Sequence, residues 1–170
     1  MHQNNSSKFG ILILLVFLAG GCLRFVNLSA DPPTTVGLHF ISDEGWWVHN
    51  ARNKVLFDQW VMDEFNQSLL ASPTFCMATY GVYSFAGVSY ATSRVVPVIS
   101  GLLCVLLLFG VLWKRSTDSS LLIAIGVFSL NFSFVTLNRT AYVDSTGLMF
   151  LMLCWWLLEK HLSRVWAPYL

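Results

Sequence analysis

Apolar residues form long uncharged runs along this chain. Two of these runs, Val95 to Trp113 and Ser119 to Asn138, contain no Asp, Glu, Lys or Arg. A helix that crosses the hydrocarbon core of a bilayer needs about 20 mostly apolar residues. The pattern therefore predicts membrane-spanning helices over 95–113 and 119–138. The short connection between them predicts an antiparallel pair.

Two further spans are predicted near the ends of the sequence. The first apolar run begins at Phe9, and Arg24 can snorkel to the membrane surface, which extends the span to about residue 26. The last span covers about 142–158. The expected fold is an all-α integral membrane protein with about four spans, at 9–26, 95–113, 119–138 and 142–158.

The basic residues predict the orientation of these spans. They cluster at three places that fall on one side of a four-span protein, namely at Lys8, at Lys114 and Arg115, and at Lys160 and Arg164. The loop 30–93 on the other side holds six acids and only two bases. Because Lys and Arg favour the cytoplasmic side, both termini are expected in the cytoplasm and the loop outside, as in a bacterial inner (plasma) membrane.

The later part of this outside loop is uncharged from Phe65 to Ser93 and could be counted as a fifth span. It would then run into Val95 without room for a turn, and it would invert the charge pattern downstream. Its hydroxyl groups, its glycines and Ser72-Pro73 are more typical of amphipathic helices that lie at the membrane interface.

Composition agrees with the membrane class. Hydrophobic residues make up 55% of the chain and charged residues 11%, and the mean hydropathy is +0.61. The net charge of +1 and the absence of a basic stripe give no indication of a nucleic-acid partner. The four cysteines stand singly in apolar surroundings, which predicts small buried hydrophobic side chains rather than a zinc site.

The start of the outside loop predicts a helix from the N-cap Ser42 to about Trp60. At helical spacing one face mixes polar and aromatic residues, while Glu44, Val48, Ala51 and Val55 lie on another. The members of the mixed face are Asp43, Trp46, Trp47, Asn50, Lys54 and Phe57. Such a face suits sugar binding. The alternative is that Asp43 only complements the helix dipole and that the tryptophans only anchor the helix at the interface.

A second polar group lies at the outer end of the third and fourth spans. It is Asn138-Arg139-Thr140-Ala141-Tyr142-Val143-Asp144. An acid at the mouth of a span is costly unless it is paired or functional. The group therefore predicts either part of a site or a local ion pair between Arg139 and Asp144.

Together these residues resemble the polyprenyl-phosphate-dependent glycosyltransferases of the GT-C fold. Within this fold the chain is most similar to family 39, the protein O-mannosyltransferase-like group, which includes aminoarabinose transferases. Enzymes of this group act in protein glycosylation or lipopolysaccharide modification. The resemblance is carried by Asp43-Glu44, by the helix with Trp47 and Ala51, by Ser72-Pro73, by Gly87-Val88-Ser89-Tyr90-Ala91-Thr92-Ser93-Arg94, and by Arg139 with Asp144. It covers nearly the whole chain through the order of these motifs.

The resemblance implies a transferase that moves a sugar from a polyprenyl-phosphate carrier to an acceptor outside the cytoplasm. It implies Asp43 as the catalytic base, Glu44 as a companion acid, Asp144 as a second active-site acid and Arg139 as a contact to the lipid phosphate. The polar-aromatic face adds Asn50, Lys54 and Trp47 as candidate substrate contacts. No cofactor and no metal are expected beyond the lipid-linked donor.

The chain differs from members of this family in length, because they have many more spans. The chain is expected to be the N-terminal portion of such an enzyme, inactive alone, with the missing C-terminal half as its partner. An alternative is a non-catalytic remnant or partner-dependent subunit. A small four-span transporter is disfavoured, because the second and third spans carry no ionisable residue.

Overall fold

The computed structural model describes residues 3–30, 43–61 and 67–166, and every regular element in these ranges is a helix. This confirms the all-α prediction for the described part of the chain. The helices are α1 (Gln3–Phe25), α2 (Asp43–Phe57), α3 (Ser68–Ala71), α4 (Pro73–Ala86), α5 (Tyr90–Ser93), α6 (Val95–Leu112), α7 (Asp118–Leu130), α8 (Phe132–Asn138) and α9 (Asp144–Trp166).

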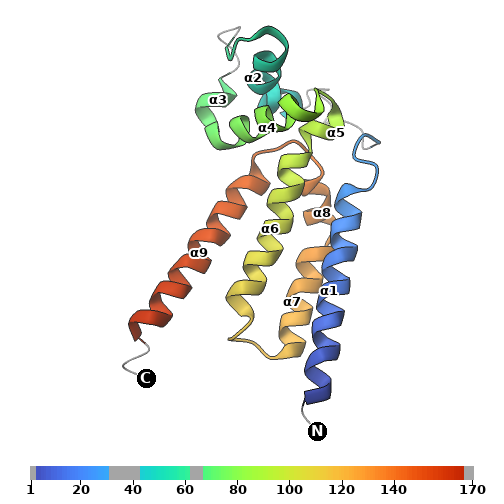
Figure 1. Cartoon of the computed structure of the whole chain (residues 1–170), viewed down its shortest axis with the longest axis vertical. Coiled ribbons are helices and arrows are strands. Elements are labelled where there is room, and N and C mark those ends of the chain that lie inside the picture. Colours follow the sequence, from blue (N-terminus) through green and yellow to red (C-terminus); the bar gives the residue numbers. More distant parts are fainter. Residues whose placement is uncertain (1–2, 31–42, 62–66, 167–170) are drawn as a thin grey trace.

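The long helices form a stem, and the short helices of the first loop form a cap at one end of it (Figure 1). In the stem α6 packs mainly on α9, and α1 packs mainly on α7. The cap consists of α2, α3, α4 and α5. The first turn of α1 and the last turn of α9 both lie at the end of the stem opposite the cap (Figure 1).

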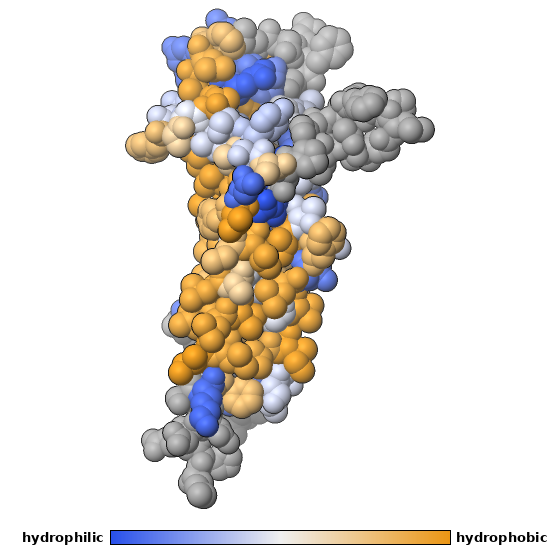
Figure 2. Space-filling view, turned by 90° about the vertical axis from the view of Figure 1, so that its right-hand side faces the viewer, coloured by the Kyte–Doolittle hydropathy of each residue, from blue (hydrophilic) through white to orange (hydrophobic). Residues whose placement is uncertain are grey.

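Two helical segments of the described chain are long and apolar enough to cross a membrane, Lys8–Phe25 and Tyr90–Leu112. The bent pair α7 and α8 would make a third if it forms one span. Large apolar side chains of the stem face outward, such as Ile123 at 67% and Leu151 at 69% exposure. Figure 2 shows this apolar surface between hydrophilic groups at the two ends of the molecule. An exposed apolar surface of this kind is typical of a membrane protein.

The expected third span is not one continuous helix. It is divided at Asn131 into α7 and α8, whose axes differ by 51°. Asn131 has an extended backbone, with φ −60° and ψ 124°, and its side-chain oxygen accepts a hydrogen bond from the N–H of Phe134 over 3.0 Å. The asparagine thus ends one helix and caps the next.

The uncharged stretch before α6 forms three separate helices. Its longest helix, α4, has 14 residues, begins with Pro73 and ends at Gly87, which has a φ of 76°. A helix of this length extends about 21 Å, which is short of the roughly 30 Å of a bilayer core. In Figure 1 α4 lies across the upper end of the stem, as expected of a juxtamembrane helix.

Arg24 does not snorkel outward as predicted, because it points into the stem and is fully buried. Its guanidinium donates to the carbonyls of Phe128 (3.0 Å) and Ser129 (2.7 Å) and to Asn138 Oδ1 (2.8 Å). The last carbonyls of a helix have no partner within it, and the break after α7 places two of them inside the stem. Arg24 supplies the donors that they need.

The cysteine prediction is half right. Cys76 and Cys104 are buried, whereas Cys22 and Cys154 lie exposed on α1 and α9. All four are free thiols.

Candidate functional site

The contacts between cap and stem centre on Glu44, in the first turn of α2. Both carboxylate oxygens of Glu44 are held by Arg94, with Nε to Oε1 at 2.9 Å and Nη2 to Oε2 at 2.8 Å. The side chains of Arg94 and Glu44 are only 1% and 4% exposed. This two-pronged geometry is the strongest form of an Arg–carboxylate pair.

The same pair also binds the backbone of two other segments. Glu44 Oε1 accepts a hydrogen bond from the N–H of Ala141 over 2.7 Å, and Arg94 Nη1 donates to the carbonyl of Leu28 over 2.6 Å. Four segments therefore meet at one ion pair: the residues after α1, the start of α2, the junction of α5 and α6, and the connection from α8 to α9. A buried pair is tolerated when its remaining polar atoms are bonded in this way.

This junction brings together the segments that carry the two predicted catalytic acids. Asp43 is the first residue of α2 and the neighbour of Glu44, and its side chain, like the predicted cap Ser42, lies outside what the structure describes. Asp144 is the first residue of α9, three positions after Ala141, and is exposed. Both acids are the first residue of a helix.

Arg139 lies at the same end of the stem, beside the last turn of α1. Its Nη1 donates to the carbonyls of Leu23 (2.6 Å) and Val26 (2.8 Å), and its Nη2 donates to that of Asn27 (3.3 Å). These carbonyls lie in the last turn of α1 and directly after it, where they need donors from elsewhere. The side chain of Arg139 is half-buried. The alternative ion pair with Asp144 stays a prediction.

The predicted polar-aromatic face of α2 is divided in the structure. Asn50 is fully buried: its side-chain oxygen accepts from Ser68 Oγ (2.6 Å) and the N–H of Leu69 (2.9 Å), and its Nδ2 donates to the carbonyl of Trp60 (2.7 Å). These bonds tie α2 to the chain around α3. The amide of Asn50 thus holds neighbouring segments of the cap together, a role that the sequence did not indicate.

The other described members of that face lie nearer the surface. Lys54 Nζ binds Asp58 through Oδ1 (2.5 Å) and the carbonyl oxygen (3.2 Å), where α2 ends. Trp47 is half-buried and packs edge-to-face on Trp46, with ring centroids 4.6 Å apart. An indole pair at the surface of the cap can cover the apolar face of a sugar ring.

The core of the cap is formed by the face of α2 that carries Val48 and Ala51. These two residues pack with Phe75, Cys76 and Tyr83 of α4. The Tyr83 hydroxyl bonds that of Ser93 over 2.5 Å. Burial raises the pKa of Tyr83, and it raises the pKa of Cys76 to about 11. Cys76 therefore stays a thiol at neutral pH and is not a candidate nucleophile.

Arg94 was not among the predicted site residues. The signal was present, because a single arginine directly before an uncharged span requires a partner. The sequence does not show that this partner is Glu44, which lies 50 positions earlier. Among the described residues no group of three His, Cys, Asp or Glu side chains could hold a metal ion.

No protein-family model, no curated protein and no solved structure matches the chain. The assignment of a chemistry therefore rests on the residues at the junction of cap and stem. These are two acids at helix starts, the half-buried Arg139 and an aromatic pair.

Proposed function

We propose that the chain is a membrane module of a glycosyltransferase that transfers a sugar from a polyprenyl-phosphate carrier to an acceptor outside the cytoplasm. The observation that carries the proposal is the hydrogen bond from Ala141 to Glu44. It joins the start of α2, with Asp43, to the segment that leads into α9, with Asp144. The bond supports the proposal that two acids on distant parts of the sequence belong to one rim at the end of an apolar stem.

The proposed chemistry uses each group at this rim in a different role. A lipid-phosphate sugar carries its own leaving group, so the protein needs a base for the acceptor and positive charge near the phosphate. Asp43 is the proposed base, Asp144 the second acid and Arg139 the contact to the phosphate. Glu44 is now assigned as a positioning residue, because both of its oxygens are bound by Arg94 and one also by Ala141.

The proposal gives the candidate substrate contacts two kinds of role. Trp47 and its neighbour Trp46 form the proposed platform for a sugar ring. Asn50 and Lys54 are proposed to act indirectly, because their polar atoms bind the segments that shape this part of the cap.

The proposal includes four spans with both termini in the cytoplasm. α9 is the proposed fourth span, antiparallel to α6, with its charged residues Glu159 and Lys160 beyond the apolar stretch. The basic residues near the start of α1 and the ends of α6 and α9 lie at the end of the stem away from the cap (Figure 1). The cap is then on the outer face of a bacterial inner membrane.

The test compares Asp43→Asn with Asp58→Asn in membranes that contain the chain together with the rest of its enzyme. Transfer from radiolabelled undecaprenyl-phosphate sugars is measured at matched protein levels. Removal of a positioned base lowers the rate by roughly a hundred- to ten-thousand-fold, and we expect such a loss for Asp43→Asn. Asp58 is exposed and pairs with Lys54 away from the rim, so Asp58→Asn should transfer normally. A near wild-type rate for Asp43→Asn would remove the catalytic assignment.

The second candidate function is a partner-dependent subunit without chemistry of its own. It is favoured by the engagement of Glu44 and Asn50 in the fold rather than in an open site. It predicts that Asp43→Asn and Asp144→Asn both leave transfer unchanged, while Glu44→Ala abolishes assembly. The catalytic module predicts the opposite result for the two aspartates.

A further inference from the structure

Arg24 does more than satisfy the break after α7, because one of its donors is directed elsewhere. Its Nη1 and Nη2 donate to carbonyls at the end of α7, whereas its Nε donates to Oδ1 of Asn138, the last residue of α8, over 2.8 Å. Both side chains are fully buried. A buried ionisable residue inside an apolar stem is costly, and such residues usually serve a function. The contact with Asn138 indicates where that function lies.

Asn138 extends this contact to α9. Its Nδ2 donates to Oγ of Ser145 over 2.8 Å, and Ser145 is also fully buried. Both ends of the amide are thus bonded, one to α1 and the other to α9. These three side chains form a relay of hydrogen bonds. The relay ends beside Asp144, because Ser145 is the next residue of α9.

Helix α6 restrains Asn138 from a further side. A Cβ at Gly101 would lie 2.1 Å from Oδ1 of Asn138, so the amide lies directly against the backbone of α6. It therefore cannot turn without breaking one of its bonds. Ser100, the residue before Gly101, makes a separate contact with α9, since its hydroxyl lies 3.1 Å from that of Thr146.

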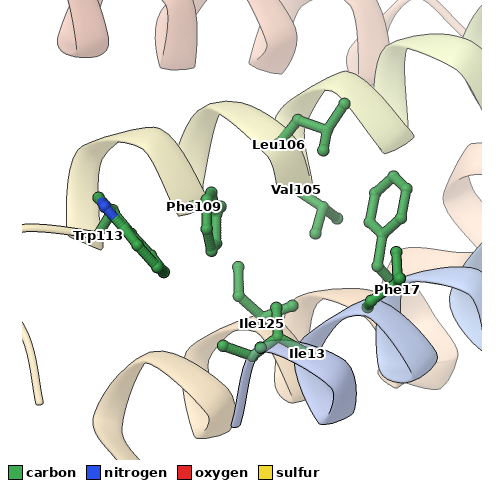
Figure 3. A pocket seen from close by; sticks show the side chains of 9 residues that line it. Ile13, Phe17, Val105, Leu106, Phe109, Trp113 and Ile125 are labelled. Atoms are coloured by element: carbon green, nitrogen blue, oxygen red, sulfur yellow. The ribbon is translucent and has the colours of Figure 1, made fainter. Parts of the chain in front are cut away.

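Apolar packing between α1 and α6 is incomplete. In the half of the stem that lies away from the cap, the two helices border an apolar groove of about 270 Å³. Figure 3 shows Phe109 and Trp113 of α6 on one side of this groove and Ile13 and Phe17 of α1 on the other. The relay lies in the other half, where α1 ends. There it supplies directed bonds from α1 to α8 and α9.

We propose that Arg24 and Asn138 are positioning residues of the proposed transferase. Through Ser145 they fix where α9 begins and thereby place Asp144, the second acid. The inference rests on the function proposed above and extends it, because it gives a buried cation of the first helix a part in the reaction. A displacement of about 1 Å at a reacting group can lower a rate by about a hundredfold.

Pulsed electron paramagnetic resonance on the chain in a bilayer tests the placement of α9 without any reaction. Nitroxide labels are attached at Thr136→Cys on α8 and Leu151→Cys on α9, both exposed, after Cys22 and Cys154 are replaced by serine. Arg24→Lys keeps the charge but lacks the fork of donors. We expect the distance between the labels to shift by about 1–2 Å and its distribution to broaden. A merely structural role would reduce the amount of folded chain without moving the labels in the molecules that stay folded.

Two buried serines provide a matched pair of milder variants, which decide the question if Arg24→Lys does not insert. Ser145→Ala removes only the last bond of the relay and should move the labels in the same direction. Ser100→Ala removes a hydroxyl contact between α6 and α9 and should leave the distance unchanged. An unchanged distance in Ser145→Ala, or in folded Arg24→Lys, would overturn the inference. Equal shifts in the two serine variants would overturn it as well.

The same variants are then measured for transfer together with the rest of the enzyme, at matched protein levels. Arg24→Lys should lower kcat by about a hundredfold, and Ser100→Ala should transfer normally. Normal transfer by a variant with shifted labels would overturn the positioning role and leave the assignment of Asp43 intact. Absence of transfer by the wild type would instead overturn the proposed function, and the distances would still decide whether the relay fixes the start of α9.

Discussion

Glu44 and Arg94 lie 50 positions apart, yet they form the most buried ion pair among the described residues. By contrast, the surface pair of Lys54 and Asp58 leaves the side chain of Asp58 92% exposed. Burial removes the hydration of both charges, and the pair is tolerated because each of the three guanidinium nitrogens of Arg94 donates to an oxygen. The resulting rigidity fixes where α2 begins, and with it the position of Asp43.

Replacement of Glu44 by alanine should be strongly destabilising. It leaves the Arg94 guanidinium buried without its carboxylate, which costs about 3–5 kcal/mol of the free energy of unfolding. Lys54→Ala breaks a solvent-exposed pair and should cost less than about 1 kcal/mol. Both free energies can be measured by titration with sodium dodecyl sulfate in mixed micelles, followed by circular dichroism. Equal stability of the two variants would contradict the structural role of Glu44.

Single residues also show where prediction from sequence ends. The burial of Val48 and Ala51 was predictable, because helical periodicity alone places them on one face. The burial of Asn50 was not, because its hydrogen-bond partners Ser68 and Leu69 belong to a separate segment. A polar side chain looks the same in a sequence whether it binds a ligand or another loop.

Among the helices, the apolar segments are the most predictable. Lipid requires a long run in which every backbone group is bonded, so composition reveals α6 with nearly its observed limits and α1 with its end, although α1 begins six residues before the predicted start. The break at Asn131 does not change composition and has no proline to mark it. It depends on a cap bond to Phe134 and on Arg24 from another helix, and neither contact is visible in the local sequence.

Two adjacent glycines of α1 provide a matched test of the contact with α7. A Cβ at Gly20 would lie 2.7 Å from the carbonyl oxygen of Ser129, whereas a Cβ at Gly21 would meet only Leu102 at 3.9 Å. Gly20→Ala must push the two backbones apart and disturb the Arg24 bonds at the same place. We expect a loss of about 1–3 kcal/mol for Gly20→Ala.

Gly21→Ala is the control, because alanine is favoured over glycine inside a helix by about 0.5–1 kcal/mol. It should leave the stem unchanged or slightly more stable. The two variants can be compared by the same titration in mixed micelles. If they were equally stable, α1 and α7 would not pack as closely as the structure shows.

At the scale of the whole molecule, the four-span topology stays a proposal, and it rests on the distribution of charge. Long apolar runs predict how many segments can enter a membrane, and basic residues predict their direction. The way the cap sits on the stem could not be predicted, because it depends on Glu44, Arg94 and Ala141 meeting across the chain. The proposed site was therefore predictable as a set of residues but not as an arrangement.

The topology can be tested by labelling of single cysteines with a membrane-impermeant maleimide in intact cells. Ser84 is exposed on α4 in the cap, and Ser119 is exposed in the first turn of α7 at the opposite end of the stem. Each is replaced by cysteine in a chain whose exposed Cys22 and Cys154 are serine. With the basic residues retained in the cytoplasm, Ser84→Cys should label in intact cells and Ser119→Cys only after permeabilisation. The reverse pattern would invert the topology, and labelling of both positions from outside would mean that the stem does not separate two sides of a membrane.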